Sequence, residues 1–190
     1  VRCVVSHYIR SGSTVNLCAL DLKKAFDKTN HHGLYIQLMK RLIPCNLLCL
    51  LENWYSICIT CVRWGDVFSN FVHLKYGVWQ GGVLSPLLFA CYIDDIPVVR
   101  IMEVSGLGCK IKHTPVYADD IILRSPSVSA LQQMLFLCER ELAHLEMSLN
   151  PKKSVCIRFG PRFDALCESL ITIDGQRLSW AKSCRYLGSI

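Results

Sequence analysis

The sequence predicts an α+β fold in which helices pack on one face of an antiparallel sheet. Strand-like segments outnumber the helical crossovers that parallel strands need, and this favours antiparallel pairing. Turn pairs such as Gly65-Asp66 and Asp174-Gly175 separate neighbouring strand-like runs and predict hairpins. The 190 residues, of which 52% are apolar, can bury a large core in one domain, or in one domain and part of another.

The first half of the chain is expected to contain one strand, two helices and one hairpin. Leu34, Leu38 and Leu42 recur at helical spacing, and Pro44 ends their helix because proline lacks a backbone donor. The expected elements are a strand over 15–20, a loop or short helix over 23–27, the helix that ends at Pro44, a helix over 46–55, and hairpin strands over 57–63 and 67–76.

The second half is expected to alternate helices with hairpins after a loop over residues 77–83. Ser85-Pro86 is a favourable cap and first turn for a helix. Apolar residues at helical spacing between Leu131 and Leu145 predict a long helix that packs against the core. The other expected elements are a hairpin over 116–123, a strand over 154–159, a hairpin over 171–178 and a short strand over 184–187.

Two Asp-Asp pairs have nearly identical neighbours, but only one is predicted to be functional. Asp94-Asp95 follows the helix that begins at Pro86, so its carboxylates are expected in solvent at a helix C-terminus. Asp119-Asp120 lies between short β-branched runs and is expected at the tip of a hairpin. An isolated Asp-Asp pair is more often a simple turn, so the wider context must decide its role.

A third carboxylate, Asp21, ends the apolar run over residues 15–20. Ionised carboxylates in apolar surroundings are destabilising unless another charge compensates them. Oxygen ligands from two chain segments suit Mg²⁺ or Mn²⁺ better than zinc. The sequence therefore predicts that Asp21, Asp119 and Asp120 bind a divalent cation.

The charge balance favours a polyanionic partner, although a solvated surface would explain the same charges. Lysine and arginine number 21 against 15 acidic residues, a net charge of +6. No apolar stretch reaches the roughly 18 residues of a membrane helix, so no membrane partner is expected. Phosphate contacts are expected from the basic residues Lys23, Lys24, Lys152, Lys153, Arg158 and Arg162.

The twelve cysteines are predicted to be reduced and mostly buried, because no secretory leader opens the sequence. Cys18, Cys138 and Cys156 stand where small apolar side chains would fit, as does Cys91. The single C-x-x-C motif at Cys58 lacks further ligands nearby, which argues against zinc.

Five segments in order resemble the palm and part of the fingers of a reverse transcriptase from a non-LTR, LINE-like retrotransposon. The resemblance spans about residues 15–188 and implies a right-hand polymerase palm with partial fingers and no thumb. It also implies that residues 1–190 are one fragment, incomplete at both ends. The matching segments are Ala-Leu-Asp-Leu-Lys-Lys-Ala-Phe-Asp (19–27), Gly-Val-Trp-Gln-Gly-Gly-Val-Leu-Ser-Pro (77–86), Tyr-Ala-Asp-Asp (117–120), Asn-Pro-Lys-Lys-Ser (150–154) and Tyr-Leu-Gly (186–188).

The resemblance implies an RNA-directed DNA polymerase that acts in retrotransposition, in the nucleus or the cytoplasm. Its expected partners are an RNA template, a DNA primer, a deoxynucleoside triphosphate, and the missing fingers and thumb segments of a parent polyprotein. The transfer is in-line at phosphorus, and two metals about 3.5–4 Å apart stabilise the attacking and leaving oxygens. By resemblance Asp21 and Asp119 bridge the metals, and Asp120 tunes the charge of the site or binds one of them.

Other motif residues take substrate-binding roles by resemblance. Phe26 would lie under the sugar and reject a 2′-hydroxyl, although core packing is the alternative explanation. The remaining nucleotide and template contacts are expected from Gln80, Gly81, Gly82 and Tyr117.

Lys153 would protonate or neutralise the departing pyrophosphate, unless the adjacent Lys152 substitutes for it or both only form a solvated turn. The segment Tyr186, Leu187 and Gly188 resembles the hairpin that grips the primer end.

One residue departs from the family pattern. Relatives usually carry arginine before the glutamine of the second segment, where this chain has Trp79. This favours one alternative, a catalytically degenerate retrotransposon remnant. A noncatalytic RNA-binding palm is a second alternative, and a template-independent or RNA-dependent RNA polymerase is a third, which Phe26 disfavours.

Overall fold

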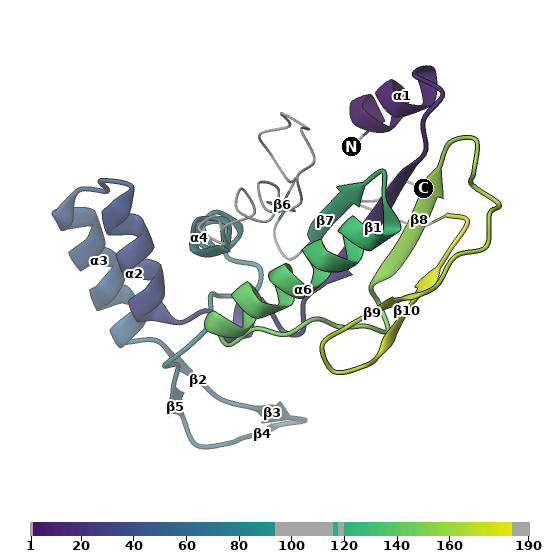
Figure 1. Cartoon of the computed structure of the whole chain (residues 1–190). Helices are drawn as coiled ribbons and strands as arrows, with labels where there is room; N and C mark the ends of the chain where they lie inside the picture. The colour runs from purple at the N-terminus through teal and green to yellow at the C-terminus, as the bar shows by residue number, and fades with distance from the viewer. Residues whose placement is uncertain (1, 94–115, 118–119, 184–190) are drawn as a thin grey trace. The chain divides into compact units, whose positions relative to one another are not determined.

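The computed structural model describes residues 2–93, 116–117 and 120–183 (Figure 1). The chain divides into two compact units: residues 24–95 form one, and residues 1–23 together with 96–190 form the other. Both helices and strands occur, with hairpins between neighbouring strands, so the predicted α+β class is confirmed.

The sheet unit, residues 1–23 with 96–190, is built around one six-stranded sheet of order β6-β7-β1-β8-β10-β9. The central strand β1 pairs antiparallel with both neighbours, so that Cys18 lies opposite Leu123 on one side and Cys156 on the other. The expected strands over 15–20 and 154–159 are confirmed, as are both hairpins of this unit. The bounds are β1 (Val15–Asp21), β6 (Val116–Tyr117), β7 (Asp120–Ser125), β8 (Val155–Phe159), β9 (Leu170–Ile171) and β10 (Arg177–Trp180).

The sheet is mixed, so the prediction of a purely antiparallel sheet was wrong in one place. Strand β10 runs parallel to β8, with Ser179 opposite Val155. The β9–β10 hairpin joins the sheet through its second strand, and residues 160–169 connect β8 to its first strand. Side-chain alternation is the same in parallel and antiparallel strands, so the sequence pattern did not specify this direction.

Helices cover both faces of β1, which corrects the expectation of helices on one face. Helix α6 (Val128–His144) buries the predicted apolar stripe, including Leu135 and Cys138, and contacts β7 and β1. Helix α1 (Arg2–Arg10), which the sequence analysis missed, packs Val5 and Tyr8 against the cluster of Val15, Leu17 and Ile122. Residues 15 and 17 point away from the face of residue 18, because successive strand residues alternate between faces.

The buried thiols of this unit lie between β1, β8 and α6. The Sγ atoms of Cys18 and Cys156 are 3.5 Å apart, and both side chains are fully buried. A hydrogen bond with Cys156 and burial raise the pKa of Cys18, and burial raises the pKa of Cys138 to about 12. The free cysteines among the described residues include Cys18, Cys138 and Cys156, which are buried, and Cys45 and Cys49, which are exposed.

In the native protein at pH 8, Cys18, Cys138 and Cys156 are expected to resist a thiol reagent while the exposed Cys45 and Cys49 react. The thiolate is the reactive form, and burial disfavours it at Cys18 and Cys138, while Cys156 is shielded from the reagent because its side chain is fully buried. Peptide mass spectrometry after labelling would map the modified residues, with guanidinium-unfolded protein as the control in which all react. Equal labelling rates for both groups in the native protein would contradict this packing.

The described residues of the helical unit, 24–93, form three α-helices, and α2 contacts both α3 and α4. A Cβ added at Gly33 would lie 2.9 Å from the Tyr92 ring, so a glycine permits the close approach of α2 and α4. Helix α2 ends at Lys40, earlier than the predicted end at Pro44, and Leu42 lies outside it with a φ of +57° and an exposed side chain. The second helix and the helix from Ser85-Pro86 are confirmed. The bounds are η1 (Phe26–Lys28), α2 (His31–Lys40), α3 (Cys45–Ser56) and α4 (Ser85–Ile93).

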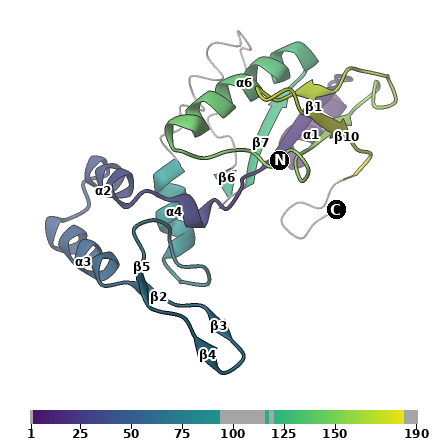
Figure 2. The ribbon, with the colours of Figure 1, turned by 90° about the horizontal axis from the view of Figure 1, so that it is seen from below.

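The predicted hairpin over residues 57–76 forms two short ladders that extend away from α2 and α3 (Figure 2). The outer ladder turns at Gly65, and the apolar side chains Trp64, Phe68 and Phe71 along the hairpin are 85%, 59% and 69% exposed. We call residues 57–76 the exposed hairpin. Its strands are β2 (Ile59–Thr60), β3 (Arg63–Trp64), β4 (Val67–Phe68) and β5 (Val72–His73).

Some predicted features lie outside the described residues. These are the Asp94-Asp95 pair, Asp119, the strand over 184–187, and the segment Tyr186, Leu187 and Gly188. Within the part that the structure describes, no helix combines the length and the apolar character that crossing a membrane requires.

Candidate functional site

The sheet unit brings two of the predicted acidic positions next to each other. Asp21 is the last residue of β1, and its Cα partner in the ladder is Asp120, the first residue of β7. Tyr117 in turn pairs with Asp120, so β6 and β7 form the predicted hairpin. Paired residues in an antiparallel ladder have Cα atoms about 4.5–5.5 Å apart. Asp119 precedes Asp120 in the sequence but lies outside the described residues.

A turn over residues 150–154 holds the backbone of Asp21 from the β8 side. The Asn150 N–H donates to the Asp21 carbonyl at 2.8 Å, and the Asp21 N–H donates to Ser154 Oγ at 3.0 Å. The Ser154 hydroxyl donates in turn to the Asn150 carbonyl at 2.9 Å. These bonds join the first and fourth motif segments into one local structure at the end of β1.

Ser154 is a site residue that the sequence analysis missed, and its side chain is only 2% exposed. The sequence carried no signal for this role, because the burial that obliges the hydroxyl to find hydrogen-bond partners is visible only in the structure. Lys152 and Lys153 are exposed in the same turn, and the Lys153 N–H donates to the Asn150 carbonyl at 3.1 Å. This placement is compatible with both a phosphate contact and a solvated basic turn.

The Asp21 carboxylate has the environment of a potential cation ligand. Asp21 is half-buried, and its carboxylate makes no hydrogen bond or ion pair to another side chain among the described residues. Within residues 2–93, 116–117 and 120–183, no three His, Cys, Asp or Glu side chains form a cluster able to hold a metal ion. Carboxylate oxygens such as those of Asp21 nevertheless suit Mg²⁺ or Mn²⁺ by ligand type.

In the helical unit, the loop over residues 76–80 is bound to the segment over 26–31, and we call this contact the loop clamp. Val78 N–H donates to the Phe26 carbonyl, and Gly77 N–H to the Thr29 carbonyl, both at 2.8 Å. The His31 Nε2–H donates to the Gly77 carbonyl at 2.7 Å, which fixes the proton on that nitrogen because a carbonyl only accepts.

Only glycine fits the backbone geometry of the loop clamp at position 77. Its φ of +91° lies in the left-handed region, and an added Cβ would lie 3.0 Å from the Phe26 carbonyl oxygen. The second motif segment is thus fixed to the first by main-chain contacts at close range.

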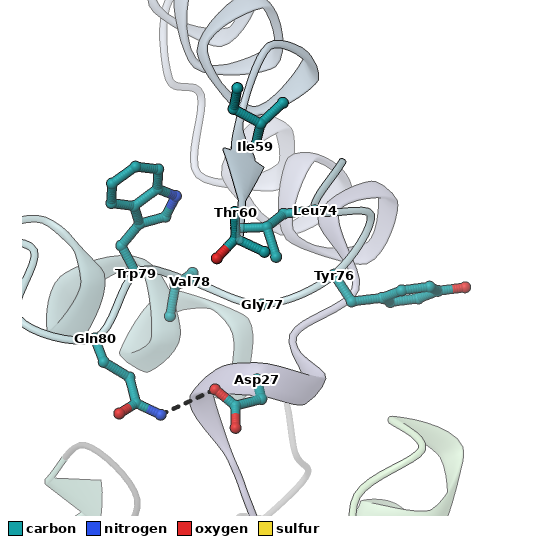
Figure 3. A pocket seen from close by; sticks show the side chains of 9 residues that line it. All are labelled: Asp27, Ile59, Thr60, Leu74, Tyr76, Gly77, Val78, Trp79 and Gln80. Atoms are coloured by element: carbon teal, nitrogen blue, oxygen red, sulfur yellow. Dashed lines mark hydrogen bonds between the residues drawn. The ribbon is translucent and has the colours of Figure 1, made fainter. Parts of the chain in front are cut away.

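The clamped loop lines a pocket of about 380 Å³ (Figure 3). Gln80 Nε2 donates to Asp27 Oδ1 at 2.9 Å, and the amide oxygen of Gln80 is turned away from Asp27. Gly81 has a φ of +82° with open space at its Cβ position, so its backbone is accessible. Gly82 closes a turn by donating its N–H to the Trp79 carbonyl at 3.1 Å. The lining residues are Asp27, Ile59, Thr60, Leu74, Tyr76, Gly77, Val78, Trp79 and Gln80.

Phe26 combines packing with partial exposure. Its ring centroid lies 5.0 Å from that of the fully buried Phe89, at an interplanar angle of 58°. The core-packing explanation therefore holds for one part of the ring. The residue remains half-buried, so the other part is accessible to a ligand.

Arg158, one of the basic residues expected to contact phosphate, uses much of its guanidinium group within the protein. Its Nε donates to Asn16 Oδ1 and one Nη to the Ala165 carbonyl, both at 2.8 Å, and its guanidinium stacks on Trp180 at 5.0 Å. Asn16 is 1% exposed and needs this donor because a buried amide oxygen must be satisfied.

Comparison with known proteins identifies relatives over most of the chain. The model of the reverse transcriptase (RNA-dependent DNA polymerase) family matches residues 5–190. The RNA-directed DNA polymerase from mobile element jockey of Drosophila funebris is 29% identical over 179 residues, or 91% of this chain and 19% of that protein. The Retrovirus-related Pol polyprotein from type-1 retrotransposable element R2 of Nasonia vitripennis is 29% identical over 139 residues, or 72% of this chain and 14% of that protein.

A solved structure supports the fold. The apo telomerase from Candida tropicalis truncated from its C-terminal domain matches with a TM-score of 0.60 at 16% identity. The match covers 83% of this chain and 35% of the telomerase chain. The architecture is therefore shared with a protein whose sequence has diverged widely.

Proposed function

Because this chain belongs to the reverse transcriptase family, we propose that it is the palm and part of the fingers of an RNA-directed DNA polymerase that serves retrotransposition. The observation that carries the proposal is the pairing of Asp21 with Asp120 at the end of β1, with the turn over 150–154 bound to the same residue. In this proposal the sheet unit corresponds to the palm and the helical unit to part of the fingers.

The proposed metal ligands are Asp21, Asp119 and Asp120, which supply the hard oxygen donors that Mg²⁺ or Mn²⁺ prefers. Bound divalent ions would neutralise charge on the attacking and leaving oxygens of the transferred phosphoryl group. Ser154 fixes the backbone of Asp21 and therefore the origin of its side chain. The exposed Lys153 in the same turn is proposed to neutralise the leaving pyrophosphate.

The proposed nucleotide contacts come from the loop clamp. The accessible part of the Phe26 ring would lie under the sugar and exclude a 2′-hydroxyl, and its packing on Phe89 keeps the ring in place. Gln80 and the accessible backbone at Gly81 would contact the nucleotide. Gly82 and Tyr117 would contact either the nucleotide or the template. The primer grip is proposed for residues 186–188.

A noncatalytic RNA-binding remnant is the second candidate, and Trp79 favours it. The Trp79 side chain is 48% exposed at the position where relatives usually carry arginine, so this position supplies no cation to the pocket. An exposed indole still stacks on nucleobases. Such a protein would retain RNA without extending a primer.

Primer extension distinguishes the two candidates. On an RNA template with an annealed DNA primer, the chain joined to its flanking fingers and thumb segments is expected to add deoxynucleotides in Mg²⁺, to stop when EDTA removes the metal, and to use ribonucleotides poorly. Gel analysis of a labelled primer measures this, and filter binding of labelled RNA measures retention. RNA retention that EDTA does not change, without any extension by the folded chain, would support the remnant instead.

A further inference from the structure

The Asp27 carboxylate has a defined partner that neither the motif roles nor the family assignment explains. It accepts a hydrogen bond from Gln80 Nε2 at 2.9 Å, although 53 positions separate the two residues in the chain. Both side chains are exposed and line the 380 Å³ pocket (Figure 3). Exposed glutamine side chains ordinarily sample several rotamers, so a fixed partner restricts this one.

The backbones beneath the two side chains are also bound to each other. Asp27 lies between Phe26 and Thr29, whose carbonyls accept the N–H groups of Val78 and Gly77. Gly77 and Val78 are themselves buried, so the separation of the two segments is fixed before the side chains meet. The Asp27–Gln80 hydrogen bond therefore adds a side-chain contact to segments that backbone hydrogen bonds already hold together.

The contact also determines which way the Gln80 amide faces. An ionised carboxylate only accepts hydrogen bonds, so it selects the NH₂ end of the amide. The amide oxygen is then held on the side away from Asp27, as an acceptor available to a ligand. Without Asp27, the amide could rotate and present either end.

We infer that Asp27 is a positioning residue that orients the Gln80 amide for the incoming deoxynucleoside triphosphate. This inference rests on the proposed function, in which Gln80 contacts that substrate. Asp27 itself need not touch the substrate, because its effect passes through the amide.

Steady-state primer extension tests the inference with five variants: Asp27→Ala, Asp27→Asn, Gln80→Ala, the double alanine variant and Asp66→Ala. Asp27→Ala is expected to raise KM for the deoxynucleotide about fivefold and to change kcat less than twofold, as expected for one exposed charged hydrogen bond. Asp27→Asn offers Gln80 an acceptor oxygen but also a donor, so it should restore the affinity only in part. Asp66, whose side chain is fully exposed at the tip of the exposed hairpin, is the matched carboxylate control and should leave KM unchanged.

The double variant separates positioning from a structural role. If Asp27 acts through Gln80, removing it from the Gln80→Ala protein has no further effect on KM. An additional loss there, or an unchanged KM in Asp27→Ala alone, would overturn the inference.

A second measurement does not depend on activity. In the ¹⁵N–¹H spectrum, the side-chain NH₂ signals of Gln80 are expected to shift and exchange faster in Asp27→Ala than in the native chain. Native-sequence protein that extends no primer when joined to its flanking fingers and thumb segments would refute the proposed function. Unchanged Gln80 signals would refute the inference, whether or not extension occurs.

Discussion

Replacing Asp21 with asparagine is expected to reduce primer extension about a thousandfold, a loss of roughly 4 kcal/mol in transition-state stabilisation. Asparagine keeps the shape of the side chain but removes the charge that a divalent cation requires. The bonds that join residue 21 to Asn150 and Ser154 use its backbone, so the substitution leaves them in place. The fold should therefore persist while nucleotide addition stops.

The measurement compares single-nucleotide incorporation, RNA retention and thermal unfolding for native protein and Asp21→Asn. Asp174→Asn is the matched control, because Asp174 is an exposed carboxylate in the β9–β10 turn of the same unit. The control should retain native rates, and both variants should retain RNA. Native incorporation by Asp21→Asn would remove Asp21 from the metal site.

Replacing Leu20 with alanine is expected to have the largest effect on stability, about 2–5 kcal/mol of unfolding free energy. Leu20 is 1% exposed on the central strand and lies opposite Ile121 of β7, which is equally buried. Neighbouring strands on both sides of β1 prevent a collapse that would fill the cavity. The adjacent Asp21 should then lose its fixed position, and activity should fall with stability.

Urea denaturation followed by circular dichroism measures the change. Leu166→Ala removes the same atoms from a side chain that is fully exposed, so it should shift the unfolding free energy by less than about 0.5 kcal/mol. A similar small shift for Leu20→Ala would contradict the position of β1 in the core.

The features that the sequence predicted correctly are those with strong local signals. The stripe from Leu131 to Leu142 lies on one side of α6 because a helical period places it there. Gly65-Asp66 and Asp174-Gly175 mark turns because their local chemistry favours reversal of the chain. The pairing of β6 with β7 followed from two short β-branched runs around the acidic pair.

The features that the sequence did not predict depend on partners that are far away in the chain. Ser154 looks like any serine until the strand end at Asp21 supplies its partner. Asp27 and Gln80 meet only because the loop clamp brings their segments together. The parallel direction of β10 and the packing of α1 likewise follow from tertiary contacts, which residue periodicity does not encode.

The exposed hairpin has a practical consequence for work with this chain in solution. A two-stranded ladder has two open edges, whose free amide and carbonyl groups can pair with another polypeptide. The exposed hairpin also carries exposed aromatic rings such as Trp64 and Phe71, so two molecules that meet can pair their strand edges and bury these rings against each other. Concentrated samples should therefore aggregate through the exposed hairpin, and light scattering should detect these aggregates under conditions in which the six-stranded sheet is still folded.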